Sequence, residues 1–272
     1  MPRFRSSERL AILYFVYVAL IAPFYIRQPW RTSLLAVAVA SGFWLTHSGK
    51  PILRDLIPLA AVLAAYREMD WFSATPHDHH LENTWVAWDR VLLDHWHLRQ
   101  IIESGGAVLP EFLEFCYLLV YGVGPLVVLM AILTRKRHGT DQLWMAYLAG
   151  TLGAYALFPY FPSDPPRTLF PASDLPHVMT FMRHLNLSIV GGYGIHSSVF
   201  PSAHVSSSFS AAWGLLRTIP EKRWIGWCVF AYAVLVSIAT VYGRYHYAAD
   251  VLAGFTVSLL AIPAERMVSP SE

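Results

Sequence analysis

Charged residues are scarce in this chain. Only 14% of its 272 residues are charged, whereas 55% are hydrophobic. A soluble domain carries about 25% charged residues, because its whole surface faces water. The mean hydropathy of +0.41 agrees with this shortage. Together these values exclude an ordinary soluble domain and indicate a membrane protein.

Cysteine is almost absent as well, since Cys116 and Cys228 are the two examples in the chain. Both lie in apolar runs, and two such residues build neither a disulfide framework nor a thiolate metal site. The net charge of +2 is too small for a nucleic-acid-binding surface, so no nucleic-acid partner is expected. In contrast, the 10 Trp and 14 Tyr are typical of aromatic belts at membrane interfaces.

Apolar runs of roughly 17–25 residues, the length that crosses a bilayer as a helix, are frequent. The segment 199–216 is rich in small and hydroxyl residues, which let transmembrane helices approach closely. Two weaker segments are either two more spans or one re-entrant pair. We therefore predict an all-α, polytopic transmembrane helix bundle of about six to eight spans, the first one uncleaved. The segments are Leu10–Ile26, Ser33–Thr46, Ile52–Tyr66, Phe112–Leu133, Leu143–Phe158, Val199–Leu216, Trp224–Tyr242 and Ala248–Pro263.

Short basic segments orient these spans, because Lys and Arg accumulate on the cytoplasmic side. Eight spans place all the basic segments on one side and two long loops, 67–110 and 159–198, on the other. Within the first long loop, Trp85–Glu103 reads as an amphipathic helix lying at the interface. The short basic segments that orient the spans contain Arg3, Arg5, Arg9, Lys50, Arg54, Arg135, Lys136, Arg137, Arg217, Lys222 and Arg223.

Three short motifs fall on the non-cytoplasmic side in this topology. They are Asp164-Pro165-Pro166-Arg167, Phe200-Pro201-Ser202-Ala203-His204 and the segment Gly243–Asp250. The topology and the chemistry thus agree, although they rest on different residues.

The second motif has the composition of an anion site at a helix start. Pro201 suits the first turn of a helix, where its missing N–H is not needed. The free amides and the positive dipole end of that helix suit a phosphate group. Ser202 adds a hydroxyl, and His204 extends from the first turn toward the same space.

The third motif has the form of an activated nucleophile. His246 and Asp250 are spaced i, i+4 and share a face if a helix begins near His246. A carboxylate that accepts a hydrogen bond from one imidazole nitrogen leaves the other nitrogen free to attack phosphorus. Arg167 and Arg244 supply guanidinium groups, which match phosphate oxygens with paired hydrogen bonds.

On these residues the chain resembles the type 2 phosphatidic acid phosphatase superfamily, and most of all its branch of inositol phosphorylceramide synthases and similar lipid phosphotransferases. The resemblance covers Phe112 to Pro263 and is strongest at 201–204 and 246–254. It implies one integrated membrane domain in which 112–272 is the catalytic core and 1–111 supplies N-terminal helices and an external segment.

The resemblance also implies roles for the site residues. His246 matches the nucleophile that forms a phosphohistidine, Asp250 its orienting partner, and His204 the general acid. Ser202 and Arg167 match phosphate-binding positions, and Arg244 is assigned with them. No metal and no cofactor is expected at this site. The expected partners are a membrane lipid substrate and, for transfer, a polyol or other alcohol acceptor.

Two departures from the phosphatase pattern favour the phosphotransferase branch. Thr240 stands six residues before the nucleophile, where phosphatases usually carry an Arg, and Arg244 stands two residues before it. Asp164 begins the first motif, where phosphatases have a Lys upstream of Arg-Pro. The predicted function is thus a metal-independent integral-membrane lipid phosphotransferase whose active site faces the non-cytoplasmic side.

Three other hypotheses stay open at the level of sequence. One is a lipid phosphate phosphatase that acts on a phosphatidate-like or polyprenyl-phosphate-like substrate. A second is a membrane carrier or scaffold that binds phosphate lipids without turnover. A third is a metal-dependent hydrolase that uses a histidine-rich segment of the first long loop, which contains His77, Asp78, His79, His80, Asp94, His95 and His97.

Overall fold

The structure, a computed structural model, describes residues 4–47, 51–72, 77–134, 139–171 and 174–268. Within these ranges every regular element is helical, which confirms the predicted all-α fold. The first half contains α1 (Ser6–Ile21), α2 (Trp30–Thr46), α3 (Pro51–Met69), α4 (His80–Arg90), α5 (Leu98–Glu103), α6 (Val108–Leu118) and α7 (Val123–Thr134). The second half contains α8 (Thr140–Leu157), α9 (Pro166–Leu169), α10 (Phe181–Tyr193), α11 (Ala203–Thr218), α12 (Arg223–Tyr242), α13 (Ala248–Ser258) and α14 (Ala261–Arg266).

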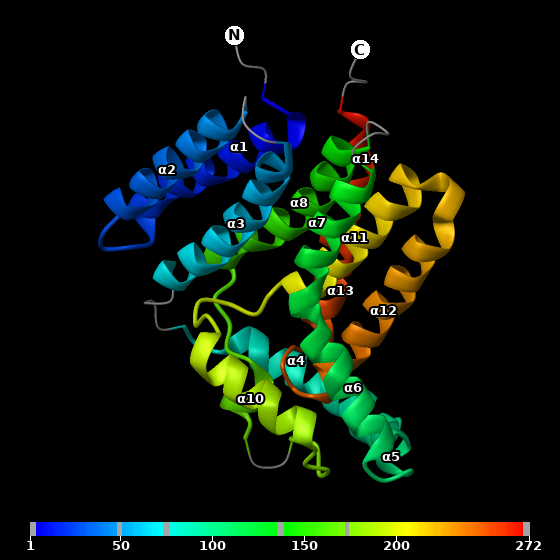
Figure 1. Ribbon diagram of the computed structural model, residues 1–272. Helices are drawn as coiled ribbons and strands as arrows, with labels where there is room; N and C mark the ends of the chain where they lie inside the picture. Colours follow the sequence, from blue (N-terminus) through cyan, green and yellow to red (C-terminus); the bar gives the residue numbers. More distant parts are fainter. Residues whose placement is uncertain (1–3, 48–50, 73–76, 135–138, 172–173, 269–272) are drawn as a thin grey trace.

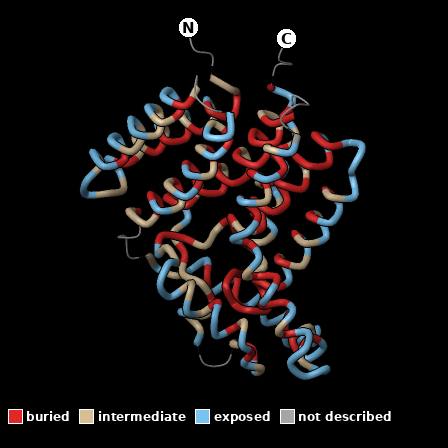
Figure 2. Tube along the Cα trace, viewed as in Figure 1, coloured by how far each residue is buried: buried red, intermediate tan, exposed pale blue. Residues whose placement is uncertain are grey.

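The surface of the helices indicates contact with lipid. Four helical stretches are long and apolar enough to cross a membrane: Ser6–Phe24, Val108–Leu133, Pro220–Tyr242 and Ala248–Arg266. Figure 2 shows exposed residues along the outward sides of the helices. Many of them are large and apolar, which is unusual for a surface that faces water. The chain is therefore an integral membrane protein. The exposed large apolar residues include Leu13, Leu20, Leu34, Trp44, Trp224, Trp227 and Leu252.

Helix α11 lies in the middle of the bundle and packs closely on α8, α12 and α13. Its small residues permit this approach, as the sequence predicts. The Ser206 hydroxyl donates to the Gly150 carbonyl of α8 at 2.8 Å. A Cβ atom added at Gly150 would lie 1.8 Å from Oγ of Ser210. The serine-rich sequence of α11 thus serves helix packing along most of its length.

The two ends of the bundle differ in character. Figure 1 shows both chain termini and the turn between α11 and α12 at one end, and α4, α5 and α10 at the other. Near the termini, Nη1 of Arg5 lies 2.6 Å from Oδ1 of Asp55, and Nε of Arg54 lies 2.5 Å from Oε1 of Glu8. The described residues of the short basic segments thus lie at the end of the bundle opposite α4, α5 and α10. The basic residues Arg3, Lys50, Arg135, Lys136 and Arg137 lie outside the described residues.

The interface helix predicted over Trp85–Glu103 is wrong as a single element. Helix α4 begins earlier, at His80, and a π turn ends it before α5 starts after His97. His97 adopts a left-handed φ of +59°, which breaks the helical path. In addition, α4 buries Trp85 and Asp89. The apolar periodicity identifies a face of α4 but does not reveal that this face packs on protein rather than lipid.

Candidate functional site

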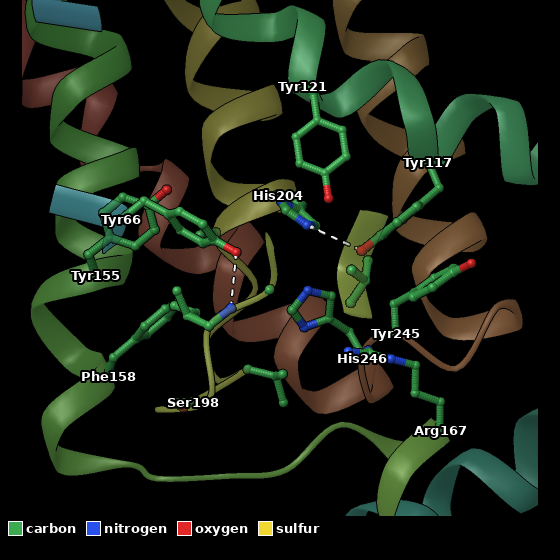
Figure 3. A pocket seen from close by; sticks show the side chains of 15 residues that line it. Tyr66, Tyr117, Tyr121, Tyr155, Phe158, Arg167, Ser198, His204, Tyr245 and His246 are labelled. Carbon is green, nitrogen blue, oxygen red and sulfur yellow. Dashed lines mark hydrogen bonds between the residues drawn. The ribbon is translucent and has the colours of Figure 1, made fainter. Parts of the chain in front are cut away.

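One pocket collects residues from all three sequence motifs. Arg167, His204 and His246 line it, as Figure 3 shows. The rest of the lining comes from α3, α6 and the turn after it, the end of α8 and the turn after it, α10, the segment before α11, the first residue of α11, and the loop between α12 and α13, and it is rich in tyrosine. These residues are Tyr66, Tyr117, Tyr121, Tyr155, Phe158, Val190, Gly194, Ile195, Ser198, Val199, Ala203 and Tyr245.

His246 lies in the short loop between α12 and α13 and is oriented by Asp250. Its Nδ1 atom lies 3.2 Å from Oδ2 of Asp250, and the backbone N–H of Tyr247 donates to the same oxygen at 2.8 Å. Helix α13 begins at Ala248, two residues after the histidine, so the carboxylate sits in its first turn. Because a carboxylate only accepts hydrogen bonds, this contact places the ring proton on Nδ1 and leaves a lone pair on Nε2.

The surroundings of His246 favour the neutral ring. Burial lowers the pKa of His246 from 6.5 to about 3, because a charged imidazolium loses its hydration there. The positive charge of Arg167 acts in the same direction, and the Val199 carbonyl opposes it more weakly. The histidine is therefore an unprotonated nitrogen base at neutral pH.

His204 approaches His246 from the first turn of α11. The two ring centroids are 5.6 Å apart and the ring planes are nearly perpendicular, at 86°. The Nε2 atom of His204 lies 3.5 Å from the hydroxyl of Tyr117, whose ring stacks on Tyr245 with centroids 3.8 Å apart. Two imidazoles from different motifs thus flank one space in the pocket.

Arg167, in the short helix α9, supplies positive charge to this space. Its backbone N–H donates to the Arg244 carbonyl at 3.1 Å, which ties the first motif to the third. Its guanidinium carbon lies 5.6 Å from the centroid of the Tyr245 ring. No carboxylate in the described part of the chain forms an ion pair with this guanidinium, so its charge is available to an anion.

Ser202 does not line the pocket but connects two motifs. Its Oγ accepts from the Val205 amide at 3.4 Å as the N-cap of α11, and its own N–H donates to the Asp250 carbonyl at 2.9 Å. Pro201 therefore precedes the cap, so the prediction that it occupies the first helical turn is wrong. A Cβ at Gly254 would lie 2.4 Å from the Ser202 carbonyl oxygen, and this glycine lets α13 approach the second motif.

Arg244 is fully buried and also lies outside the pocket lining. Its Nη1 atom pairs with Oδ2 of Asp89 at 2.5 Å, and its backbone has a left-handed φ of +61°. The other Asp89 oxygen accepts from the Ala248 amide at 2.9 Å, at the start of α13. A carboxylate is favourable at this position, because the first amides of a helix carry partial positive charge.

Sequence reasoning missed Asp89 and a second buried ion pair. Burial raises the pKa of Asp89 even though Arg244 and the Ala248 amide act to lower it. Farther along, Oε1 of Glu114 lies 2.7 Å from Nη1 of Arg183, and its Oε2 accepts from the Tyr245 hydroxyl at 2.7 Å. The sequence does contain one signal for such pairs, namely a charged residue on the apolar side of a helix. A buried charge of this kind costs free energy unless it is paired, so it indicates a partner elsewhere in the chain.

Comparison with known proteins agrees with this geometry. The family model described as the PAP2 superfamily matches residues 84–264, about two thirds of the chain. The chain belongs to the PAP2 superfamily. This PAP2 protein is similar to a PA-phosphatase related-family protein of Dictyostelium discoideum, with 33% identity over 73 residues. That stretch is 27% of this chain and 13% of the relative. No solved structure matches.

The PAP2 match begins inside α4, earlier than Phe112, where the motif-based resemblance begins. The structure gives a physical reason, because Asp89 on α4 contacts Arg244 and Ala248 within the third motif. Family membership indicates a lipid phosphatase or phosphotransferase. The roles of single residues and the side of the membrane on which the pocket opens stay predictions.

Proposed function

We propose that this PAP2 protein is a metal-independent lipid phosphotransferase, similar to inositol phosphorylceramide synthases, that works through a phosphohistidine. The observation that supports this most is the contact of 3.2 Å between Nδ1 of His246 and Oδ2 of Asp250 inside the pocket. It leaves Nε2 as a neutral nucleophile, and His204 approaches from the opposite side of the space.

The proposed reaction has two steps that balance protons and bonds. First, Nε2 of His246 attacks phosphorus, the bond from phosphorus to the leaving oxygen breaks, and His204, which enters this step as the imidazolium, gives that oxygen a proton and becomes neutral. Next, an alcohol acceptor attacks phosphorus, gives its proton to His204, and the bond from nitrogen to phosphorus breaks. Arg167 holds the negative phosphate oxygens, since positioning and charge stabilisation carry most of phosphoryl-transfer catalysis.

The tyrosine-rich lining supports an alcohol acceptor over water. Five tyrosines line the pocket, and although the Tyr245 hydroxyl is bound to Glu114, the hydroxyls of the other four can donate to and accept from the hydroxyls of a polyol. The residues are Tyr66, Tyr117, Tyr121, Tyr155 and Tyr245. We also propose that the pocket opens on the non-cytoplasmic side, because it lies away from the described basic residues Arg5 and Arg54.

The test is turnover of a panel of labelled lipid phosphates and phosphodiesters by the purified protein in detergent with EDTA. Each reaction contains inositol or glycerol and is repeated with His246→Ala. We expect a new phosphodiester product from the wild-type protein, a labelled histidine trapped by rapid quenching, and no turnover by the variant. Unchanged turnover by His246→Ala would contradict the phosphohistidine route.

A lipid phosphate phosphatase is the alternative, and the printed name of the Dictyostelium relative favours it. The same assay separates the two functions, because a phosphatase releases free phosphate whether or not a polyol is present. A non-enzymatic lipid carrier would instead bind labelled lipid phosphate equally well before and after His246→Ala and would turn over none of the panel.

A further inference from the structure

Four side chains with metal-ligating atoms converge at the start of α4, away from the pocket. Nε2 of His77 is in hydrogen-bonding contact with Oε1 of Glu82, and Nδ1 of His79 lies 3.3 Å from the same oxygen. The Nδ1 atom of His79 is also 3.9 Å from Oδ2 of Asp164. One atom each of His77, His79 and Asp164 lies within 4.8 Å of the other two.

One carboxylate oxygen of this cluster, Oε1 of Glu82, has more hydrogen-bonding partners than an oxygen usually accepts. Oε1 of Glu82 receives both imidazoles and, in addition, the backbone N–H of Asp164 at 3.1 Å. An oxygen offers two lone pairs to donors, so three partners on one atom exceed its usual capacity. A cation placed between the side chains resolves the crowding, because each imidazole then directs its lone pair at the ion rather than a proton at Glu82.

The donor set identifies the class of ion. Two imidazole nitrogens and two carboxylate oxygens suit a first-row transition metal in tetrahedral geometry, most of all Zn²⁺. Calcium and magnesium prefer oxygen ligands and more of them. Zinc binds nitrogen and oxygen at about 2.0–2.2 Å, which sets its tetrahedral ligand atoms roughly 3.4 Å apart, so small shifts suffice: His77 and Glu82 move apart, and Asp164 moves toward His79. Glu82 is buried and both histidines are partly buried, which limits competition from water.

We propose that His77, His79, Glu82 and Asp164 bind one Zn²⁺ ion that fastens the segment before α4 to the loop of the first motif. The site is structural. None of the four residues lines the pocket that contains His204 and His246. Zinc here is thus separate from the proposed phosphohistidine chemistry.

The position of the site explains what such a fastening does. The Asp164 carbonyl accepts from the Tyr247 hydroxyl at 3.1 Å, and Arg167 follows three residues later in α9. One turn beyond Glu82, the Trp85 ring stacks on Phe200 with centroids 4.9 Å apart. Zinc therefore fixes one end of α4 where α4 contacts both the first and second motifs.

Zinc binding by the purified full-length protein in detergent tests the proposal. The protein is stripped with EDTA, dialysed against Zn²⁺ with excess Mg²⁺, and analysed for bound metal and for affinity by calorimetry. We expect one zinc per chain. His79→Ala and Asp164→Asn should each weaken binding by at least about 100-fold, beyond the 10–100-fold typical for loss of an outer-shell partner. His80→Ala is the matched control, because His80 is exposed in the same segment and should not change binding.

Two further measurements keep the result interpretable if a variant folds poorly. Wild-type protein loaded with Co²⁺ should show the visible absorption of a tetrahedral ion, and its Tm should be higher with Zn²⁺ than with EDTA. His246→Ala should bind zinc as the wild type does, so failure of the proposed function does not affect this result. A wild-type protein that binds no zinc, or binds it as tightly after His79→Ala, would overturn the proposal.

Discussion

Oδ2 of Asp250 is shared between Nδ1 of His246 at 3.2 Å and the backbone N–H of Tyr247 at 2.8 Å. One carboxylate oxygen thus orients the proposed nucleophile and caps the first turn of α13. The other oxygen of Asp250 is buried with no hydrogen-bond partner among the described residues. The carboxylate is therefore held through one oxygen, by the His246 ring and by the Tyr247 N–H.

Asp250→Asn should lower kcat by about 10⁴-fold, as found when the orienting acid of a catalytic triad becomes an amide. The amide can donate a proton to Nδ1 and so favours the wrong tautomer of His246. Because the same atom of residue 250 faces the Tyr247 amide, this orientation leaves that buried N–H without an acceptor, so the fold should lose about 1–3 kcal/mol. The measurement is single-turnover formation of labelled phosphohistidine alongside thermal unfolding. A variant with wild-type kcat would remove Asp250 from the proposed mechanism.

The unfolding free energy should depend on pH through His246. Its folded pKa of about 3 is below the unfolded value of 6.5, so the unfolded state binds more protons between these values. The group contributes nothing above pH 6.5 and destabilises the fold as the pH falls, by up to about 1.4 kcal/mol per pH unit. His246→Asn removes this term. The Tm of the variant relative to wild type should thus rise from pH 7.5 to pH 5, and parallel Tm profiles would contradict the buried neutral histidine.

The sequence predicts the pairing of His246 with Asp250 because their separation is local. A spacing of four residues at a helix start brings two side chains together whatever the rest of the fold does. His204 and Arg167 also line the pocket, and the predicted topology places both at the same end of the bundle as His246. Motif spacing and the predicted order of the spans are therefore sufficient to predict that these three histidine and arginine side chains share one end of the bundle.

Asp89 and Arg244 show where this reasoning fails. They are 155 residues apart, and no local pattern reveals that a charge on α4 meets the loop before α13. A guanidinium near the nucleophile was interpreted as a phosphate ligand, although burial against a carboxylate explains an arginine equally well. Long-range ion pairs depend on how helices pack, and one sequence does not contain that information.

Arg244 and Arg167 should respond differently to substitution. Arg244→Met leaves the buried carboxylate of Asp89 without its partner and should destabilise the protein by about 3–5 kcal/mol. Adding Asp89→Leu should restore much of this loss. In contrast, Arg167→Ala should leave Tm nearly unchanged and weaken inhibition by inorganic phosphate. The measurements are Tm and phosphate inhibition for all four proteins. A stable Arg244→Met protein with weakened phosphate inhibition would return Arg244 to the phosphate site.

Gly254 should be intolerant of a side chain. A Cβ there would lie 2.4 Å from the Ser202 carbonyl, and backbone cannot move aside as a flexible side chain can. Gly254→Ala should cost about 1–3 kcal/mol, as overpacking does. Gly42→Ala, in α2, is the control, since nothing lies within 4 Å of its Cβ and alanine favours a helix. Equal Tm values for the two variants would contradict the close approach of α13 and the second motif.

Orientation in the membrane can be measured with single cysteines in a Cys116→Ala, Cys228→Ala background. Tyr193→Cys is suitable because Tyr193 is 70% exposed at the end of α10. Lys222→Cys reports the opposite end, in the exposed turn between α11 and α12. Ser163, in the first-motif loop, is a poor choice because its side chain is buried.

Because Lys and Arg are retained on the cytoplasmic side, an impermeant maleimide should label Tyr193→Cys in intact cells. Lys222→Cys should be labelled only after permeabilisation. The reverse pattern would place the pocket on the cytoplasmic side. In that case the lipid and the acceptor would come from the cytoplasmic leaflet, while the internal geometry of His246 and Asp250 would be unaffected, because it depends on helix packing and not on which side of the membrane it faces.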